Sequence, residues 1–141
     1  MNGGLPVPGF VRAVVRSAWI DWAIRAALAL PFAASVLAKF GNWPGAVAEA
    51  AALGFGYPVP VAAATVATQF VGCVLLFTRR LCWLGAGMLA VFTACATLVA
   101  HAFWTLQGAE RIAQMNTCFE HVAIIGGFAA VAVLAHRTCA G

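Results

Sequence analysis

The chain has 141 residues, of which 64% are hydrophobic and only 9% are charged, and its mean hydropathy is +0.96. About a quarter of the residues of an ordinary soluble domain are charged, so a soluble fold with this composition would expose large apolar patches and aggregate. The formal charge of +4 comes from basic residues that form no continuous stripe, which argues against nucleic-acid binding. The composition therefore predicts an integral membrane protein whose main partner is the lipid bilayer.

The residues before the first apolar segment, 1–17, are predicted to form a cytoplasmic tail with an interfacial helix. The tail opens with Gly and Pro residues, and its valines then recur at helical spacing, with Arg12 and Arg16 on another face. Such a helix suits the headgroup region of a membrane. We expect the remaining residues, 18–137, to form a single transmembrane domain.

Four apolar segments follow one another along that domain, at residues 18–38, 59–77, 81–100 and 119–135. Each is about 17–21 residues long, and at ~1.5 Å per residue an α-helix of that length crosses the ~30 Å hydrocarbon core of a bilayer. The third segment has only Thr93 and Thr97 as polar residues, so it lacks the polar face of a soluble amphipathic helix. The fold class is therefore predicted to be all-α, an integral membrane four-helix bundle.

Two charged residues enter the first segment. Asp21 and Arg25 lie four residues apart, so they can pair on one helix face, or Arg25 can extend towards the headgroups. These charges also argue against the alternative that the first segment is a cleaved signal peptide. Farther along, Pro31 is expected to kink the helix.

The distribution of cations predicts the orientation. One side of the membrane would hold most of them: Arg12, Arg16, Arg79, Arg80 and Arg137. The other side would hold Lys39 and Arg111, with Glu49 and Glu110 in the same loops. The positive-inside rule then places both termini in the cytoplasm. The two outer loops are expected at residues 40–58 and 104–118, the first with a short interfacial helix near residues 46–53.

The order of several short motifs resembles the DoxX family of small four-helix bacterial membrane proteins. The motifs are Ala38-Lys39-Phe40, a Gly-aromatic-Pro turn at residues 54–58, Gln69-Phe70-Val71-Gly72, Leu76-Phe77-Thr78-Arg79, His101-Ala102-Phe103-Trp104, and the stretch that opens with Phe119-Glu120-His121. Gln69 stands where relatives usually have a glutamate, and Glu120-His121 where they have Lys-Asn. The resemblance implies a bacterial inner-membrane protein linked to redox or sulfur oxidation, and in some relatives to quinone.

Polar residues are predicted to gather in a pocket near the outer leaflet. The candidates are Lys39, Gln69, His101, Trp104, Glu120 and His121. All but Gln69, which falls near the midplane, lie at the outer ends of their segments. Ionisable groups within a membrane indicate function because exposing them to lipid is costly. The alternative interpretation is that these side chains cap helix ends and hold the bundle together.

Two kinds of ligand would fit such a pocket. A histidine and a carboxylate at the membrane rim could exchange protons with a quinol hydroxyl. Alternatively, Met115, Cys118 and His121, spaced three apart on a helix face, could bind copper or another soft ion, with His101 joining from the third segment.

Four short helices with few polar groups leave little room for a complete active site. We therefore predict an accessory membrane subunit of a quinone- or sulfur-linked redox system rather than a self-sufficient enzyme, with a protein partner or a second copy beside it in the membrane. The alternatives are a non-enzymatic binder or transporter of a metal ion or small solute, and a structural membrane anchor for a partner.

Overall fold

The structure is a computed structural model that describes residues 7–139, with side chains described up to Ala135. The first six residues of the predicted tail, and the side chains of Arg137 and its neighbours, lie outside the described part. The helices in chain order are α1 (Gly9–Val15), α2 (Ala18–Gly41), α3 (Trp43–Ala52), α4 (Pro58–Leu76), α5 (Cys82–Ala100), the 3-10 turn η1 (Phe103–Thr105) and α6 (Gly108–Cys139).

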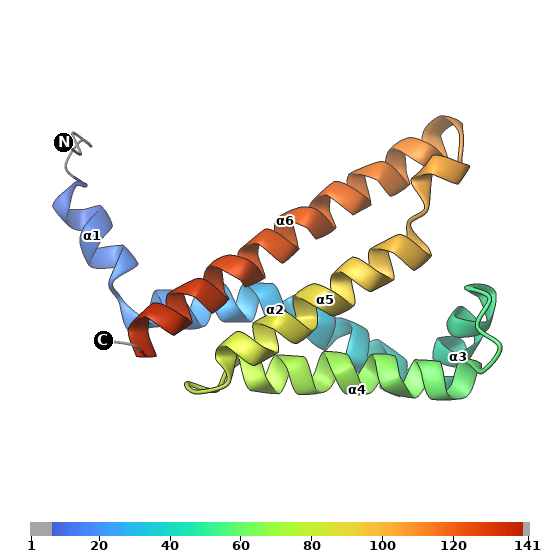
Figure 1. Ribbon diagram of the computed structural model, residues 1–141, viewed down its shortest axis with the longest axis horizontal. Helices are drawn as coiled ribbons and strands as arrows, with labels where there is room; N and C mark the ends of the chain where they lie inside the picture. Colours follow the sequence, from blue (N-terminus) through green and yellow to red (C-terminus); the bar gives the residue numbers. More distant parts are fainter. Residues whose placement is uncertain (1–6, 140–141) are drawn as a thin grey trace.

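Four helices in the described part are long and apolar enough to cross a membrane: α2, α4, α5 continued through η1, and α6 up to Ala135. The predicted class, an all-α membrane bundle, is confirmed. The start of α2, the α4–α5 turn and the end of α6 lie at one end of the bundle, where the helices converge (Figure 1). At the other end α6 diverges from α4, and α3 lies beside the beginning of α4 (Figure 1).

The structure corrects the second outer loop. Residues 104–118 were expected to be loop, but after η1 the chain enters α6 at Gly108, well before the predicted apolar segment at residues 119–135. The stretch between them is rich in Ala, Glu, Arg, Gln and Met and has no proline, so its helix propensity is high although its hydropathy is low. The expected short helix near residues 46–53 is present as α3.

The helices α4 and α5 pack closely against each other. A Cβ added to Gly85 would lie 2.5 Å from the backbone nitrogen of Leu76, and one added to Gly72 would lie 2.6 Å from the side chain of Leu89. Small residues therefore let the two helices approach closely, as is usual for helices in lipid. Phe128 of α6 is fully buried and contacts Phe32 of α2, with ring centroids 5.7 Å apart, which joins the remaining two helices to the core.

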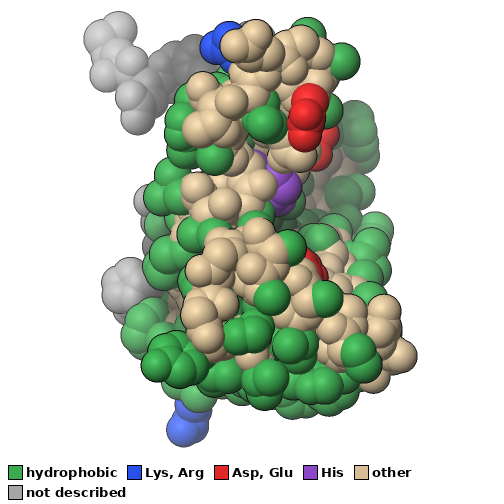
Figure 2. Space-filling view, turned by 90° about the vertical axis from the view of Figure 1, so that its right-hand side faces the viewer, with side chains coloured by type: hydrophobic (Ala, Val, Ile, Leu, Met, Phe, Trp, Pro, Cys, Tyr) green, Lys and Arg blue, Asp and Glu red, His purple; other side chains and the backbone are tan. Residues whose placement is uncertain are grey.

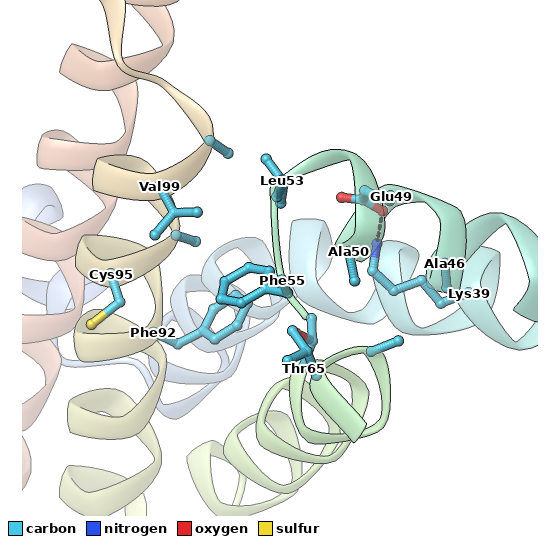
Figure 3. Close-up of a pocket in the computed structure, with 14 residues that line it drawn as sticks. Lys39, Ala46, Glu49, Ala50, Leu53, Phe55, Thr65, Phe92, Cys95 and Val99 are labelled. Carbon is cyan, nitrogen blue, oxygen red and sulfur yellow. Dashed lines mark hydrogen bonds and ion pairs between the residues drawn. The ribbon is translucent and has the colours of Figure 1, made fainter. Parts of the chain in front are cut away.

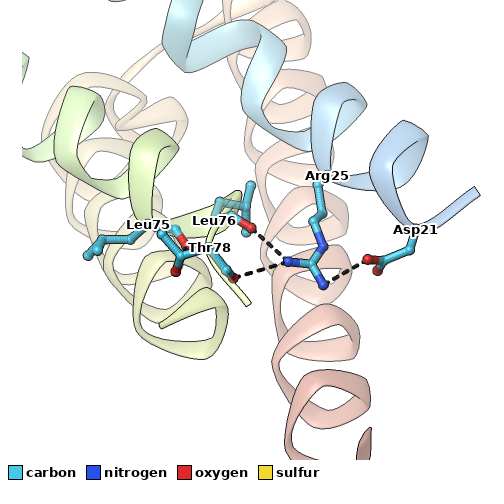
Figure 4. Close-up of polar contacts among 5 residues, drawn as sticks. All are labelled: Asp21, Arg25, Leu75, Leu76 and Thr78. Atoms are coloured by element: carbon cyan, nitrogen blue, oxygen red, sulfur yellow. Dashed lines mark hydrogen bonds and ion pairs between the residues drawn. The ribbon is translucent and has the colours of Figure 1, made fainter. Parts of the chain in front are cut away.

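Arg25 ties α2 to the end of α4. Its Nη1 donates to the carbonyl oxygen of Leu76 at 3.0 Å and to that of Thr78 at 3.4 Å, while its Nη2 pairs with Asp21 Oδ2 at 2.8 Å (Figure 4). The predicted pairing of Asp21 with Arg25 is confirmed. The guanidinium also satisfies the last carbonyls of α4, where the helix dipole favours a positive charge.

Candidate functional site

One hollow of the described chain is a cavity of about 220 Å³ at the end where the helices diverge. It lies between the end of α2, α3, the loop after α3, the first half of α4 and the second half of α5 (Figure 3). Most of its lining side chains are apolar, and its polar members are few: Lys39, Glu49, Thr65 and Cys95. We call this cavity the α3 pocket.

The charged wall of the α3 pocket is an ion pair between two helices. Lys39 Nζ, in the last turn of α2, lies 2.6 Å from Glu49 Oε2 of α3. The lysine side chain is only 16% exposed, whereas that of the glutamate is 59% exposed. The lysine charge is therefore largely withdrawn from solvent, and the carboxylate remains accessible at the mouth of the pocket.

Local capping brings these two residues together. Asn42 ends α2, and its Oδ1 accepts a hydrogen bond from the backbone N–H of Gly45 at 3.0 Å, which caps the first turn of α3. Pro44 stands in that first turn, where proline is favoured. The chain therefore turns sharply between α2 and α3, so that Glu49 returns to Lys39 across ten residues.

The aromatic wall comes from the loop after α3 and from α5. Gly54 has φ +86°, a conformation that favours glycine, and the backbone N–H of Phe55 donates to the carbonyl oxygen of Ala50 at 3.3 Å. This C-terminal cap places Phe55 in the wall of the pocket, which Phe92 of α5 also lines (Figure 3). The pocket thus offers two aromatic rings beside a single ion pair.

A second polar group lies between α5 and α6 and does not line the α3 pocket. His101 Nδ1 and Gln114 Oε1 are 2.5 Å apart, and His121 Nδ1 and Thr97 Oγ1 are 2.7 Å apart. The two imidazole rings meet edge to face, with centroids 5.0 Å apart. Seen from this end of the bundle, a histidine side chain reaches the surface among apolar groups, with acidic side chains above it (Figure 2).

The hydrogen bonds of this histidine pair assign its tautomers. Gln114 Oε1 can only accept, so His101 Nδ1 carries the proton and donates it. Thr97 Oγ1 donates its single hydrogen to the carbonyl oxygen of Thr93 at 2.6 Å, and this arrangement assigns His121 Nδ1 as the donor to Thr97. In their neutral forms both rings therefore have an unprotonated Nε2.

The structure divides the polar cluster that the sequence predicted. His101 and His121 are brought together, whereas Lys39 lies in the α3 pocket. Gln69 is buried on α4, and its Oε1 has no hydrogen-bond partner within the described part of the chain. Trp104 and Glu120 are exposed.

Sequence reasoning did not predict the pocket residues Glu49, Phe55, Phe92 and Cys95. One signal could have found Glu49. It is the only carboxylate of the first outer loop, and the short helix expected there would return it towards Lys39.

The proposed metal ligands lie on α6 and at the end of α5. Met115, Cys118 and His121 follow each other along α6, and His101 contacts His121. Across residues 7–135, no group of three or more His, Cys, Asp or Glu side chains could hold a metal ion.

Four helices that are long and apolar enough to cross a bilayer define a multi-pass helical membrane protein. The family model of DoxX matches residues 20–102, more than half of the chain, and the protein belongs to the DoxX family. The match covers every residue that lines the α3 pocket, whereas α6 lies outside it. No curated protein and no solved structure matches the chain.

Proposed function

We propose that this protein is an accessory membrane subunit of a redox system, and that it binds the headgroup of a quinone in the α3 pocket. The observation that carries the proposal is the Lys39–Glu49 ion pair in the wall of an otherwise apolar, aromatic-lined cavity. Typical pockets for drug-sized ligands have volumes of about 300–1,000 Å³, so a cavity of about 220 Å³ suits a single substituted ring.

The ion pair has the chemistry that a quinone and a quinol require. Lys39 can donate a hydrogen bond to a quinone carbonyl oxygen, and the Glu49 carboxylate can accept one from a quinol hydroxyl. Phe55 and Phe92 would lie against the ring. Interconversion of quinone and quinol moves two electrons and two protons, and we assign the electron transfer to a partner protein, which makes this chain an accessory subunit.

The placement of charges supports a bacterial inner-membrane orientation with both termini in the cytoplasm. Arg79 and Arg80 occupy the turn at the converging end, near the start of α2, and Arg12 and Arg16 precede that helix. Such clustering on one side follows the positive-inside rule. In this orientation the α3 pocket opens towards the outer leaflet, and α1, with exposed apolar side chains beside its arginines, would lie in the cytoplasmic interface.

The proposal is tested by titrating a tailless 1,4-benzoquinone into the protein in lipid nanodiscs. Lys39→Met removes the donor and leaves Glu49 at the exposed mouth, so the fold should tolerate it. Loss of a hydrogen bond from a charged donor, about 1.5–3 kcal/mol, predicts binding weakened by about ten- to a hundredfold. Glu49→Gln should weaken quinol binding, because the amide is a poorer acceptor than the carboxylate.

Glu120→Gln is the matched control, since it neutralises an exposed carboxylate of α6 that does not line the pocket. The affinity of this variant for the tailless benzoquinone should equal that of the wild type. Equal affinities of Lys39→Met and wild type, or no binding by the wild type, would reject the proposal and favour a structural anchor.

A second candidate function, binding of a soft metal ion such as copper, is favoured by the histidine pair. Both Nε2 atoms are available, and each ring is held by a hydrogen bond at Nδ1, as in many metal sites. Across residues 7–135 no third His, Cys, Asp or Glu side chain joins the pair, so the two imidazoles would be the protein ligands, with Met115 as the nearest candidate in sequence for a thioether ligand that copper(I) prefers. Copper retained by the wild type and lost in His121→Ala, but not in Glu120→Gln, would support this function. Equal copper content in all three proteins would exclude it.

A further inference from the structure

A shallow groove crosses the outside of the α4–α5 hairpin beside the α3 pocket. Its lining residues come from both helices: Thr68, Gly87, Met88, Val91, Phe92 and Cys95. Phe92 and Cys95 also line the α3 pocket, so the two hollows adjoin at these side chains. The groove is apolar and open, and it faces away from the core on two helices that are long enough to span a membrane.

We propose that this groove receives the apolar tail of the ligand whose headgroup occupies the α3 pocket, so that the ligand is a tailed, lipid-like quinone. The inference rests on the proposed function and adds the ligand class. From Cys95 to Gly87 the groove follows α5 for eight residues, which is about 12 Å at ~1.5 Å per residue. A tail laid along it leaves the pocket and runs towards the middle of the bundle.

The direction of the groove follows from the pairing of the two helices. Gly72 packs against Leu89, and Gly85 against the backbone around Leu76, which fixes the register of the antiparallel pair. In that register Thr65 of α4 lies level with the α5 turn that lines the pocket, and Thr68 lies about one turn closer to the middle of the bundle. The pocket and the groove therefore follow one another along the length of the α4–α5 hairpin.

The groove is expected to affect binding because it leaves space for the tail, not because it attracts the tail. A tail that moves from lipid into an apolar groove exchanges one apolar surrounding for another, so it gains little hydrophobic free energy. A ring seated in the pocket, however, needs an unobstructed path for the atoms attached to it. Filling the groove should therefore weaken binding of a tailed ligand and spare a tailless one.

Gly87 allows this test without disturbing the fold. It is exposed, and a Cβ built on it meets no atom within 4 Å. Gly87→Leu places a branched side chain in the groove. Gly126→Leu on α6 is the matched control, because Gly126 is also an exposed helical glycine with open space around its Cβ position.

The probes are a tailless 1,4-benzoquinone and the same ring with a decyl tail, titrated into nanodiscs. We expect Gly87→Leu to weaken binding of the decyl probe by about tenfold and to leave the tailless probe within about twofold of wild type. Gly126→Leu should leave both affinities unchanged. In a second measurement on the wild type, a decyl probe with a photoreactive tail end should cross-link to peptides of α4 and α5 around the groove.

The outcomes separate the two proposals. If neither probe binds the wild type, the proposed function fails. If the tailless probe binds but Gly87→Leu leaves the decyl affinity unchanged, or the cross-links fall on α6, the quinone pocket stands and the groove is covered by ordinary lipid chains.

Discussion

Replacing Arg25 by methionine should lower the free energy of unfolding by about 2 kcal/mol. The main loss is the charge-assisted hydrogen bond to the carbonyl oxygen of Leu76 at 3.0 Å, a kind of bond that contributes about 1.5–3 kcal/mol. The pair with Asp21 adds only about 0.5 kcal/mol, because that carboxylate is 54% exposed and screened by solvent. The buried Nε of Arg25 has no hydrogen-bond partner in the described chain, and this desolvation cost offsets part of the stability that the arginine contributes.

The assay is reversible unfolding in mixed micelles, followed by tryptophan fluorescence. Trp22 is a suitable reporter, because its ring stacks on Phe77 with centroids 5.9 Å apart, beside the arginine. Asp21→Asn should cost about 0.5 kcal/mol, and Arg80→Met, at an exposed position of the turn, should cost nothing measurable. The reasoning is refuted if Arg25→Met and Arg80→Met unfold at the same denaturant concentration.

Three further changes test the packing and the polar contacts in the same assay. Gly85→Ala should lower the free energy of unfolding by about 1–3 kcal/mol, since the new Cβ would lie 2.5 Å from backbone. Gly87→Ala, whose Cβ would have open space, should be neutral or slightly stabilising. Equal effects of the two substitutions would contradict the close approach of α4 and α5. Gln69→Met should be neutral or stabilising by about 1 kcal/mol, because the Oε1 that it removes is buried without a partner, and a clear loss of stability would reveal an unrecognised role for the amide. Thr97→Val removes the acceptor of His121 Nδ1 and should cost about 1 kcal/mol while freeing the ring, so an unchanged imidazole tautomer in nitrogen NMR spectra would argue against the assignment.

The fold could be predicted from the sequence because lipid imposes a simple requirement. Every buried backbone group in a bilayer needs an internal partner, so long apolar segments must be helices. The pairing of Asp21 with Arg25 followed from helical spacing alone. The early start of α6 at Gly108 did not follow from hydropathy, because its first turns are polar and are helical through their own propensity.

The site could be predicted only in part, since the sequence gives the depth of a residue in a bundle but not the direction in which it points around the helix axis. His101 and His121 meet because they are level on consecutive antiparallel helices. Lys39 is at a similar level, yet it faces α3. The direction in which Lys39 points relative to α3 depends on the turn at Asn42, and the geometry of this turn cannot be derived from the spacing of apolar residues.

The length of α6 has a consequence for how the protein sits in its membrane. Its 32 residues extend for about 48 Å, which exceeds the ~30 Å hydrocarbon thickness by about 18 Å. The helix must either tilt in the bilayer or extend beyond the hydrocarbon core into the headgroup region. Glu110 and Arg111 near its beginning favour extension of that end beyond the core. A thicker bilayer would cover more residues of α6 with lipid, and a thinner one would expose more of them to water. Bilayer thickness should therefore change the angle at which α6 diverges from the rest of the bundle.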